Sequence, residues 1–365
     1  MSKAINKLFW IVFGTLVVSG FLYLSSASMV AGSKKFGDPF FFVKDQFFKG
    51  LVVGLVAFLI LYLIDLKFLK KFSLLFLIGN VFLLLLTRVP GLGIEDATAD
   101  RWVNLGGFSF QPSEFLKITL VMFAAYFLSR KSVIALNSWS KTIVPFWTIA
   151  AIPLVIVFLQ PATSMVFLLV CALTAIFFCT KISLKNIFII GAIGLVALSV
   201  AVALSSSKHE YRLGRLKNFL NQSTDANYHL DQAKTGIVRG RMFGLGFGNS
   251  IQKHSYLPES FTDSIYPVIA EEFGFVFGTF VILAIYFLIC FLGLYVAFHS
   301  TDSFSSLFAI GTVTWVTIQA IMHIACMSGL IPLTGVPLPL ISYGGSDYVV
   351  TMMSMGILYN IINKS

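Results

Sequence analysis

The chain alternates long apolar stretches with short polar connections over almost its whole length. A segment inside a bilayer must satisfy its backbone hydrogen bonds internally, so each apolar stretch is expected to be an α-helix. The pattern predicts an all-α polytopic membrane protein with about ten transmembrane helices, folded as a single transmembrane domain over residues 1–365. The predicted helices lie near residues 8–30, 45–64, 73–88, 114–129, 142–160, 164–180, 186–206, 264–298, 303–327 and 346–363.

One long polar stretch interrupts this pattern. A loop of about residues 206–263 separates the seventh and eighth predicted helices, and its charged character continues to residue 274. Glycines recur there at positions 236, 240, 244, 246 and 248, among basic residues and carboxylates. Polar residues so concentrated in an otherwise apolar chain favour a functional surface.

The composition supports a membrane protein. Of the 365 residues, 57% are hydrophobic and only 12% are charged, whereas soluble domains carry about 25% charged residues. The formal net charge of +10 would suit nucleic acid, but the positive-inside bias and anionic lipid headgroups explain it more simply. We therefore expect no nucleic-acid partner.

The basic residues of the short loops predict an orientation. With the N-terminus inside, an even number of spans places both termini in the cytoplasm. The long loop then faces outward, together with residues 88–113 and 328–345. The opposite short loops hold four basic residues, Lys34, Lys35, Arg88 and Arg101. The cytoplasmic side holds eleven, namely Lys3, Lys7, Lys67, Lys70, Lys71, Arg130, Lys131, Lys141, Lys181, Lys185 and Lys364.

The stretch RWVNLGGFSFQPSEFLK, residues 101–117, leads into the fourth predicted helix. Ser113 can cap this helix, and Glu114 suits the positive end of its dipole. Lys117 lies one turn into an apolar span, where a charge is costly unless it is paired or functional. Its amine could pair with Glu114, three positions earlier, or extend to the membrane interface.

The first two residues of that stretch suggest a ligand. Arg101 and Trp102 could together hold a polar headgroup. Trp102 would equally suit an aromatic belt at the membrane interface, where tryptophan is enriched.

The glycine run GRMFGLGFGNS, residues 240–250, is a second candidate for binding an anion. Glycines let backbone N–H groups approach an anion closely. Arg239, Arg241 and Lys253 flank the run, so a phosphate or pyrophosphate site is one interpretation. The alternative is a tightly turned loop that needs positive φ angles. The run matches neither dinucleotide nor Walker fingerprints.

Carboxylates gather in and around the stretch LPESFTDSIYPVIAEEFG, residues 257–274. Thr262, Asp263 or Ser264 could cap the following helix. Asp263 and Glu271 are eight positions apart, which would place them roughly on one helical face. Capping requires fewer acids than the chain provides, so an outward-facing acid/base site is the competing interpretation. The carboxylates are Asp231, Glu259, Asp263, Glu271 and Glu272.

Three motifs in order resemble one family. They are RWVNLGGFSFQPSEFLK, GFGNSIQKHSYLPESFTDSIYPVIAEEFGF and LIPLTGVPLPLISYGGS, the last at residues 330–346. With the predicted helices they cover nearly the whole chain, which resembles the SEDS family of bacterial FtsW, RodA and SpoVE proteins. The wording of the second motif is most similar to the division-type FtsW branch.

The resemblance implies a peptidoglycan glycosyltransferase of the bacterial cytoplasmic membrane, serving cell division or cell shape. Such an enzyme polymerises lipid II into glycan strands at the outer face. By this resemblance Asp263 would be the general base that activates the acceptor 4-hydroxyl as undecaprenyl pyrophosphate leaves. The candidates for binding substrate are Arg101, Trp102, Glu114, Lys117, Arg239, Arg241, Lys253, Glu259 and Glu271.

The same resemblance implies several partners. They are lipid II, the nascent glycan strand, a class B penicillin-binding protein as transpeptidase, and other divisome or elongasome membrane proteins. A divalent cation, Mg or Mn, could assist the departure of pyrophosphate.

Departures from the family pattern and two other functions stay open. Ala162 stands where a carboxylate is usual, the sequence Arg239-Gly240-Arg241 is more basic than usual, and His323 stands where Asn is common. A lipid II flippase would use the same outward residues, but transporters of that kind show internal repeats that this sequence lacks. A non-catalytic divisome scaffold is the other alternative.

Overall fold

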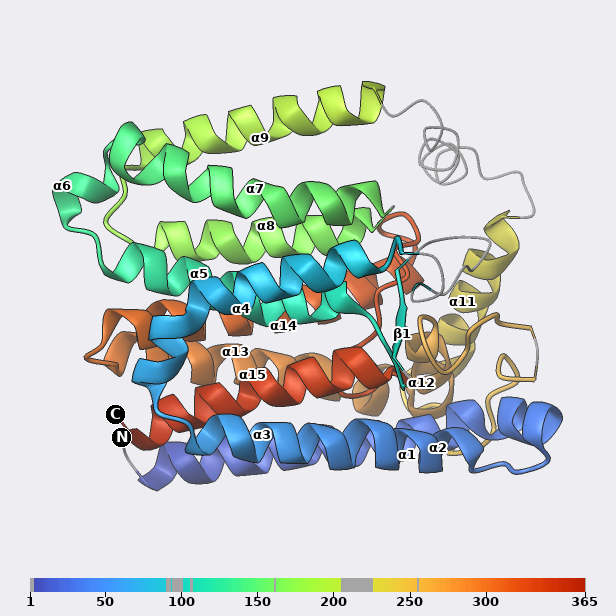
Figure 1. Ribbon diagram of the computed structural model, residues 1–365. Helices are drawn as coiled ribbons and strands as arrows, with labels where there is room; N and C mark the ends of the chain where they lie inside the picture. The colour runs from blue at the N-terminus through green and yellow to red at the C-terminus, as the bar shows by residue number, and fades with distance from the viewer. Residues whose placement is uncertain are drawn as a thin grey trace.

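The computed structural model describes residues 3–89, 93, 101–105, 108–160, 162–204, 226–254 and 256–364. Its helices run side by side and form a bundle (Figure 1). Before the long loop the helices are α1 (Lys3–Phe36), α2 (Phe41–Asp45), η1 (Gln46–Val52), α3 (Val53–Leu63), α4 (Leu66–Leu86), α5 (Pro112–Ser129), α6 (Val133–Leu136), η2 (Trp139–Ile143), α7 (Val144–Leu159), α8 (Thr163–Phe178) and α9 (Leu184–Leu204). They continue as α11 (Ala226–Gly240), α12 (Ile265–Phe273), η3 (Gly274–Phe280), α13 (Val281–His299), α14 (Ser303–Met327) and α15 (Gly345–Lys364).

A helical run overlaps each of the ten predicted stretches. The prediction of an all-α polytopic membrane fold is confirmed, while the number ten and the single domain over residues 1–365 stay predictions. Six runs in the described chain are long and apolar enough to cross a membrane by length and composition: Lys3–Phe36, Phe41–Leu63, Leu66–Leu86, Trp139–Leu159, Ile265–His299 and Ser303–Met327.

Helix α14 forms the centre of the bundle. In its most apolar window 78% of the residues are buried, against 22% for the run that contains α3. Helices α5, α8 and α13 pack against α14. The peripheral helices α3 and α4 instead expose large apolar side chains, as expected where lipid is the solvent. Polar residues on α14 therefore need partners inside the protein.

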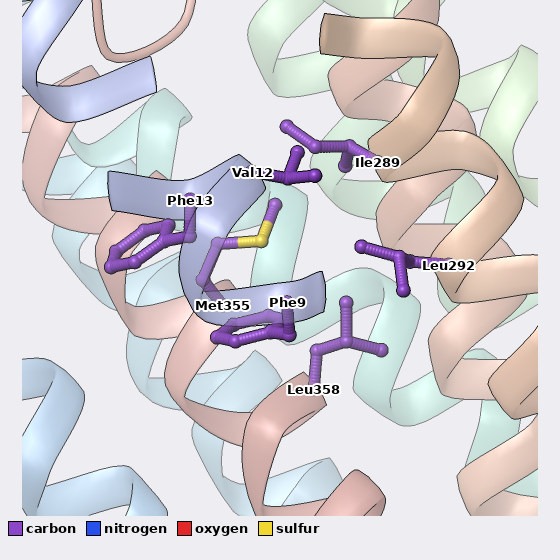
Figure 2. Close-up of a pocket in the computed structure, with 7 residues that line it drawn as sticks. All are labelled: Phe9, Val12, Phe13, Ile289, Leu292, Met355 and Leu358. Carbon is purple, nitrogen blue, oxygen red and sulfur yellow. The ribbon is translucent and has the colours of Figure 1, made fainter. Parts of the chain in front are cut away.

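The core near the chain termini is closely packed. Apolar side chains of α1, α13 and α15, among them Phe9, Leu292 and Met355, converge on a cavity of about 10 Å³ (Figure 2). Such a cavity has room for about one water molecule, and only apolar side chains line it. It is part of the core and not a ligand site.

The unusual segments of the sequence gather at one end of the bundle. The N- and C-termini lie at the opposite end from α11, α12 and the strand β1 (Figure 1). The expectation that the 88–113 segment, the long loop and the 328–345 segment share one side is consistent with the arrangement of the residues that the structure describes, while residues 90–92, 94–100, 106–107 and 205–225 lie outside them. Which side of the membrane that is stays a prediction.

Two elements at this end were not predicted. Strand β1 (Val103–Leu105) pairs antiparallel with β2 (Phe108–Phe110) and forms a small hairpin before α5. Helix α11 lies within the long loop. It buries Leu230 and Ala233 and exposes Asp231 and Thr235, which is the one-sided pattern of a surface helix.

Candidate active site beside Asp263

Asp263 lies in the turn that precedes α12, and its side chain is half-buried. Its Oδ2 atom lies 3.2 Å from the position that a β carbon on Gly335 would take. Gly335 has a φ of +62°, a conformation that favours glycine. The second and third motifs of the sequence therefore meet at this carboxylate.

The segment 334–346, here called the PLISYGG loop, is held by buried side chains from several helices. Gln319 of α14 donates from Nε2 to the Pro337 carbonyl at 2.9 Å, and His323 Nδ1 lies 2.8 Å from the Val336 carbonyl. His323 is thus a satisfied intramembrane residue on this side of its ring. These bonds, together with those of Tyr286 to Pro339 and Ser164 to Thr334, fix the loop backbone around Gly335.

A charged network lies beneath that loop. Lys117 is fully buried, and its Nζ atom lies 2.6 Å from Glu114 and 2.5 Å from Asp347 at the start of α15. Gln319 bonds to both Lys117 and Asp347, at 2.9 and 3.0 Å. The ring of Trp315 lies 4.5 Å from the same amine. The predicted pairing with Glu114 is confirmed, and the extension of Lys117 to the interface is wrong because its partners lie in the core.

A second set of contacts joins the PLISYGG loop to the turn that carries Asp263. The hydroxyl of Tyr343 donates to Asp45 Oδ2 at 2.7 Å, and the Tyr343 N–H donates to the Phe261 carbonyl at 2.9 Å. The rings of Phe42, Phe261 and Tyr343 pack with centroids 4.3 to 5.7 Å apart. Phe261 is two residues before Asp263, so this cluster positions the turn that carries the carboxylate.

The acids Glu271 and Glu272 form a separate buried network. Glu272 Oε1 lies 2.8 Å from Lys253 Nζ, which also donates to Ser26 on α1 at 2.9 Å. Glu271 accepts bonds from the Ser250 hydroxyl and the Gln252 N–H. These contacts tie the glycine run to α12 and α1. Roles for Lys253 and Glu271 in substrate binding stay predictions, and their buried partners favour a structural part.

The glycine run has the geometry of a tight turn. Gly244, Gly246 and Gly248 have φ of +80°, +94° and +82°. The N–H groups of Leu245 and Gly246 donate to the carbonyls of Glu271 and Glu272, each at 2.9 Å. Because these donors are already bonded, they are not free to cradle a phosphate, and the alternative interpretation of a turned loop is favoured.

Several sequence-level expectations about local structure were wrong. Ser113 does not cap α5: its hydroxyl accepts from the Gln111 side chain. The expectation that Thr262, Asp263 or Ser264 caps α12 is confirmed in part: Ser264 is the N-cap residue, but its side chain makes no capping bond. Asp263 precedes α12 and Glu271 is fully buried within it, so helical spacing does not place the two acids on one face.

The remaining candidates lie at the same end of the bundle. Arg101 donates from Nε to the Gln160 carbonyl at 2.9 Å, beside the start of α8. Trp102 is 37% exposed. Glu259 is exposed and accepts a bond from Thr262. Arg239 lies 4.0 Å from Glu271, and Arg241 is exposed with a φ of +48°.

The structure adds residues that sequence reasoning missed. His229 of α11 lies 2.7 Å from the hydroxyl of Ser264, the residue that follows Asp263. Burial lowers the pKa of His229, although nearby Glu259 opposes this shift. Asp347 and Gln319 could have been found from the sequence by the feature that drew attention to Lys117, namely a polar residue within an apolar run. Asp45 and Tyr343 carried no such signal.

The described residues contain no group of three or more His, Cys, Asp or Glu side chains that could hold a metal ion. Ala162, where a carboxylate is usual in the resemblance, is the N-cap residue of α8 and makes no side-chain capping bond.

Comparison with known proteins agrees with the motifs. The model of the FtsW/RodA/SpoVE family, described as cell cycle protein, matches residues 6–365. The chain belongs to the FtsW/RodA/SpoVE family. Stage V sporulation protein E of Bacillus subtilis is 33% identical over 354 residues, which cover 96% of this chain and 94% of that protein. A probable peptidoglycan glycosyltransferase FtsW of Trichlorobacter lovleyi is 35% identical over 345 residues, which cover 94% and 89%.

Solved structures of the family share the fold. A chain of a peptidoglycan synthase complex aligns with a TM-score of 0.77 at 22% identity, covering 98% of this chain and 97% of that one. The Thermus thermophilus rod shape determining protein RodA aligns with a TM-score of 0.69 at 21% identity, covering 98% and 96%. The predicted resemblance to this family is confirmed, and relatives named FtsW agree with the predicted branch.

Proposed function

We propose that this chain is a peptidoglycan glycosyltransferase that polymerises lipid II into glycan strands, with Asp263 as the general base. One observation carries the proposal: the turn that carries Asp263 packs against the PLISYGG loop, with Asp263 Oδ2 3.2 Å from the β-carbon position of Gly335 and the Tyr343 N–H donating to the Phe261 carbonyl. Relatives at about 34% identity over nearly the full length are named as probable peptidoglycan glycosyltransferases, which supports the reaction class.

The reaction follows from a positioned carboxylate. Asp263 accepts the proton of the 4-hydroxyl on the N-acetylglucosamine of the acceptor lipid II. That oxygen forms a bond to the anomeric carbon of the growing strand, while the bond from this carbon to the pyrophosphate oxygen breaks. Undecaprenyl pyrophosphate leaves with the bonding electrons. A base within hydrogen-bond reach of the hydroxyl typically contributes a rate factor of about 10² to 10⁴.

The leaving pyrophosphate needs positive charge. Of the basic candidates, Lys117 and Lys253 are bonded to buried carboxylates. Arg101 lies beside the start of α8, whose Ser164 bonds to Thr334, the neighbour of Gly335. We assign the pyrophosphate contact to Arg101, with Trp102 beside it, because of this position next to the PLISYGG loop, and Arg239 and Arg241 stay candidates for the same role. A divalent cation would add Lewis-acid stabilisation, and no step proposed here uses one.

The proposal also covers the location of the protein in the cell, its orientation and its partner. The protein lies in the bacterial cytoplasmic membrane with both termini in the cytoplasm and the Asp263 end outside, which the asymmetry of the short basic loops supports. A class B penicillin-binding protein is the proposed transpeptidase partner, alongside other divisome or elongasome proteins. The likeness to a chain of a peptidoglycan synthase complex agrees with such a partnership.

Polymerisation of labelled lipid II by the purified protein with its partner transpeptidase tests the proposal. The wild type should make glycan strands, and Asp263→Asn should make none while remaining folded and bound to its partner. Asp38→Asn is the matched control, because Asp38 is a half-exposed aspartate in the loop between α1 and α2 whose carboxylate accepts bonds from Lys44 and from the Phe40 N–H. Normal strand synthesis by Asp263→Asn would refute the base assignment.

The same purified protein with its partner distinguishes the glycosyltransferase from a lipid II flippase and from a non-catalytic scaffold. A flippase would move lipid II across liposomes without making strands. A scaffold would bind the transpeptidase and do neither. A polar transport path would use the buried Lys117 network. Lys117, however, forms ion pairs with both Glu114 and Asp347, which favours a fixed structural network.

A further inference from the structure

A lateral groove lies between α1 and the start of the long helical run formed by α12, η3 and α13. Its volume is about 560 Å³, within the range of about 300 to 1,000 Å³ typical of ligand pockets. Gly14, Val18 and Leu22 line one side, and Phe273, Phe277 and Val281 line the other. No residue of the Asp263 turn or the PLISYGG loop lines it, so the groove is separate from the proposed active site.

The glycine run lies beside two of the residues that line this groove. The ring of Phe243 lies 6.3 Å from that of Phe277, and the ring of Phe247 lies 6.2 Å from that of Phe273. The backbone is fixed in this position, because the Phe275 N–H donates to the Arg241 carbonyl at 2.9 Å. The backbone of Arg241 therefore lies next to the segment that carries the groove residues Phe273 and Phe277.

Arg241 is held in an unfavourable backbone conformation. Its φ of +48° falls in the left-handed region, which side chains other than glycine rarely adopt. The side chain is exposed and forms no ion pair with any residue that the structure describes. Neither packing nor charge pairing within the protein accounts for an arginine here, and strained residues of this kind gather at functional sites.

We infer that the groove binds one hydrocarbon chain of an anionic phospholipid and that Arg241 binds its phosphate. The groove is apolar and open on the lipid-facing side, where Val18 is 68% exposed and Phe277 is 54% exposed. One guanidinium group can donate two parallel hydrogen bonds to two oxygens of the same phosphate. The exposed rings of Phe243 and Phe247 suit a position at the level of the lipid headgroups. This inference does not depend on the glycosyltransferase reaction.

Two other occupants are conceivable for such a groove. A polyprenyl pyrophosphate shares the phosphate and the apolar chain, but it carries two phosphates and the groove offers one unpaired guanidinium. A transmembrane helix of a partner protein could pack against the small residues Gly14 and Ser19 of α1, but it would leave Arg241 without a ligand. The experiment below distinguishes all three.

Native mass spectrometry of the full-length protein in detergent tests the headgroup contact. Three lipids are added separately: phosphatidylglycerol, phosphatidylcholine and undecaprenyl pyrophosphate. The wild type should retain phosphatidylglycerol over phosphatidylcholine. Arg241→Gly should weaken the retention of phosphatidylglycerol about fivefold, the effect of losing one charged contact. It should also raise the melting temperature in lipid-free detergent, because glycine relieves the strained backbone. Arg88→Ala, at an exposed arginine outside the groove, should behave as wild type.

Filling the groove tests the chain contact. A β carbon at Gly14 would meet no atom within 4 Å, so Gly14→Phe should fold and occupy the groove, and retention of phosphatidylglycerol should fall. Gly79→Phe on α4 is the control, because Gly79 has equally open surroundings and lies outside the groove. Unchanged phosphatidylglycerol retention in both groove variants would overturn the inference. The inference would also be overturned if the groove variants lost only the retention of undecaprenyl pyrophosphate. It would likewise be overturned if Gly14→Phe lost only the binding of the partner transpeptidase.

Discussion

Oδ2 of Asp263 lies 3.2 Å from the point at which a β carbon on Gly335 would stand. The two residues are distant in sequence, and each belongs to a different motif. Any side chain at position 335 would press on the carboxylate and would also need a φ of +62°. The close approach of this backbone is therefore part of the geometry that positions Asp263.

We expect Gly335→Ala to lower the rate of lipid II polymerisation about ten- to a hundredfold, because displacement of a catalytic group by a fraction of an ångström is enough for such losses. The same variant should lose about 1–2 kcal/mol of stability from the left-handed backbone. Gly37→Ala is the control, since Gly37 has a φ of +69° and open space around it. It should show the stability loss alone. Equal activities of the two variants would contradict the positioning role of Gly335.

The Lys117 network should contribute to stability, because removing its lysine would leave buried carboxylates without a cation. Lys117→Met leaves Glu114 and Asp347 buried without a cation, so we expect a loss of about 3–5 kcal/mol. The triple variant Lys117→Met, Glu114→Gln, Asp347→Asn should recover part of it, because no charge remains to desolvate. Thermal unfolding in detergent measures both effects. Lys44→Ala breaks an exposed pair with Asp38 and should cost about 0–1 kcal/mol; a Lys117→Met as stable as this variant would refute the argument.

The apolar pattern was enough to predict the apolar helical stretches, because a segment inside a bilayer must satisfy its backbone hydrogen bonds internally. It did not predict the polar surface helix α11. The pairing of Lys117 with Glu114 followed from their spacing of three positions. Asp347 and Gln319 join Lys117, and Asp45 joins Tyr343, only in three dimensions. Their partners lie 202 to 298 positions away, and no local pattern shows such contacts.

The structure separates the residues of the polar stretch 228–274 into different environments. Residue chemistry alone could not separate Asp263 from Glu271, and the family motif made that choice. Burial explains the difference: Glu271 and Glu272 are enclosed and bonded, whereas Asp263 is half-exposed beside the PLISYGG loop. The predicted phosphate cradle was not supported, because neighbouring carbonyls already accept bonds from the glycine run.

Tyr343 should act as a positioning residue for Asp263. Tyr343→Phe removes the bond to Asp45 but keeps the ring and the N–H bond to Phe261. We expect kcat to fall about five- to tenfold, equivalent to about 1 kcal/mol for one hydrogen bond, with KM unchanged. Asp45→Asn should have a similar effect, and the double variant should be no worse than either. Burial, with Asp45 nearby, raises the pKa of Tyr343 well above 10, so its contribution should persist to pH 9.

Tyr62→Phe is the control for that experiment, because the Tyr62 hydroxyl accepts a bond from Asn363 near the C-terminus, at the other end of the bundle. It should have full activity. A change in KM with kcat unchanged would contradict this positioning role. So would additive losses of kcat in the double variant, because they would show that Tyr343 and Asp45 do not act together on Asp263.

His229 should make stability depend on pH. Its pKa in the folded protein is lowered below 6.5 by burial, so the unfolded chain binds more protons in the interval between the folded pKa and 6.5. Stability is therefore complete above about pH 6.5 and falls as the pH drops through that interval. We expect the melting temperature of wild type to fall more than that of His229→Gln between pH 7.5 and 5.5. Ser264→Ala should keep the pH dependence, because burial and not the Ser264 bond lowers the pKa. Identical pH profiles for wild type and His229→Gln would exclude a buried neutral imidazole beside Asp263.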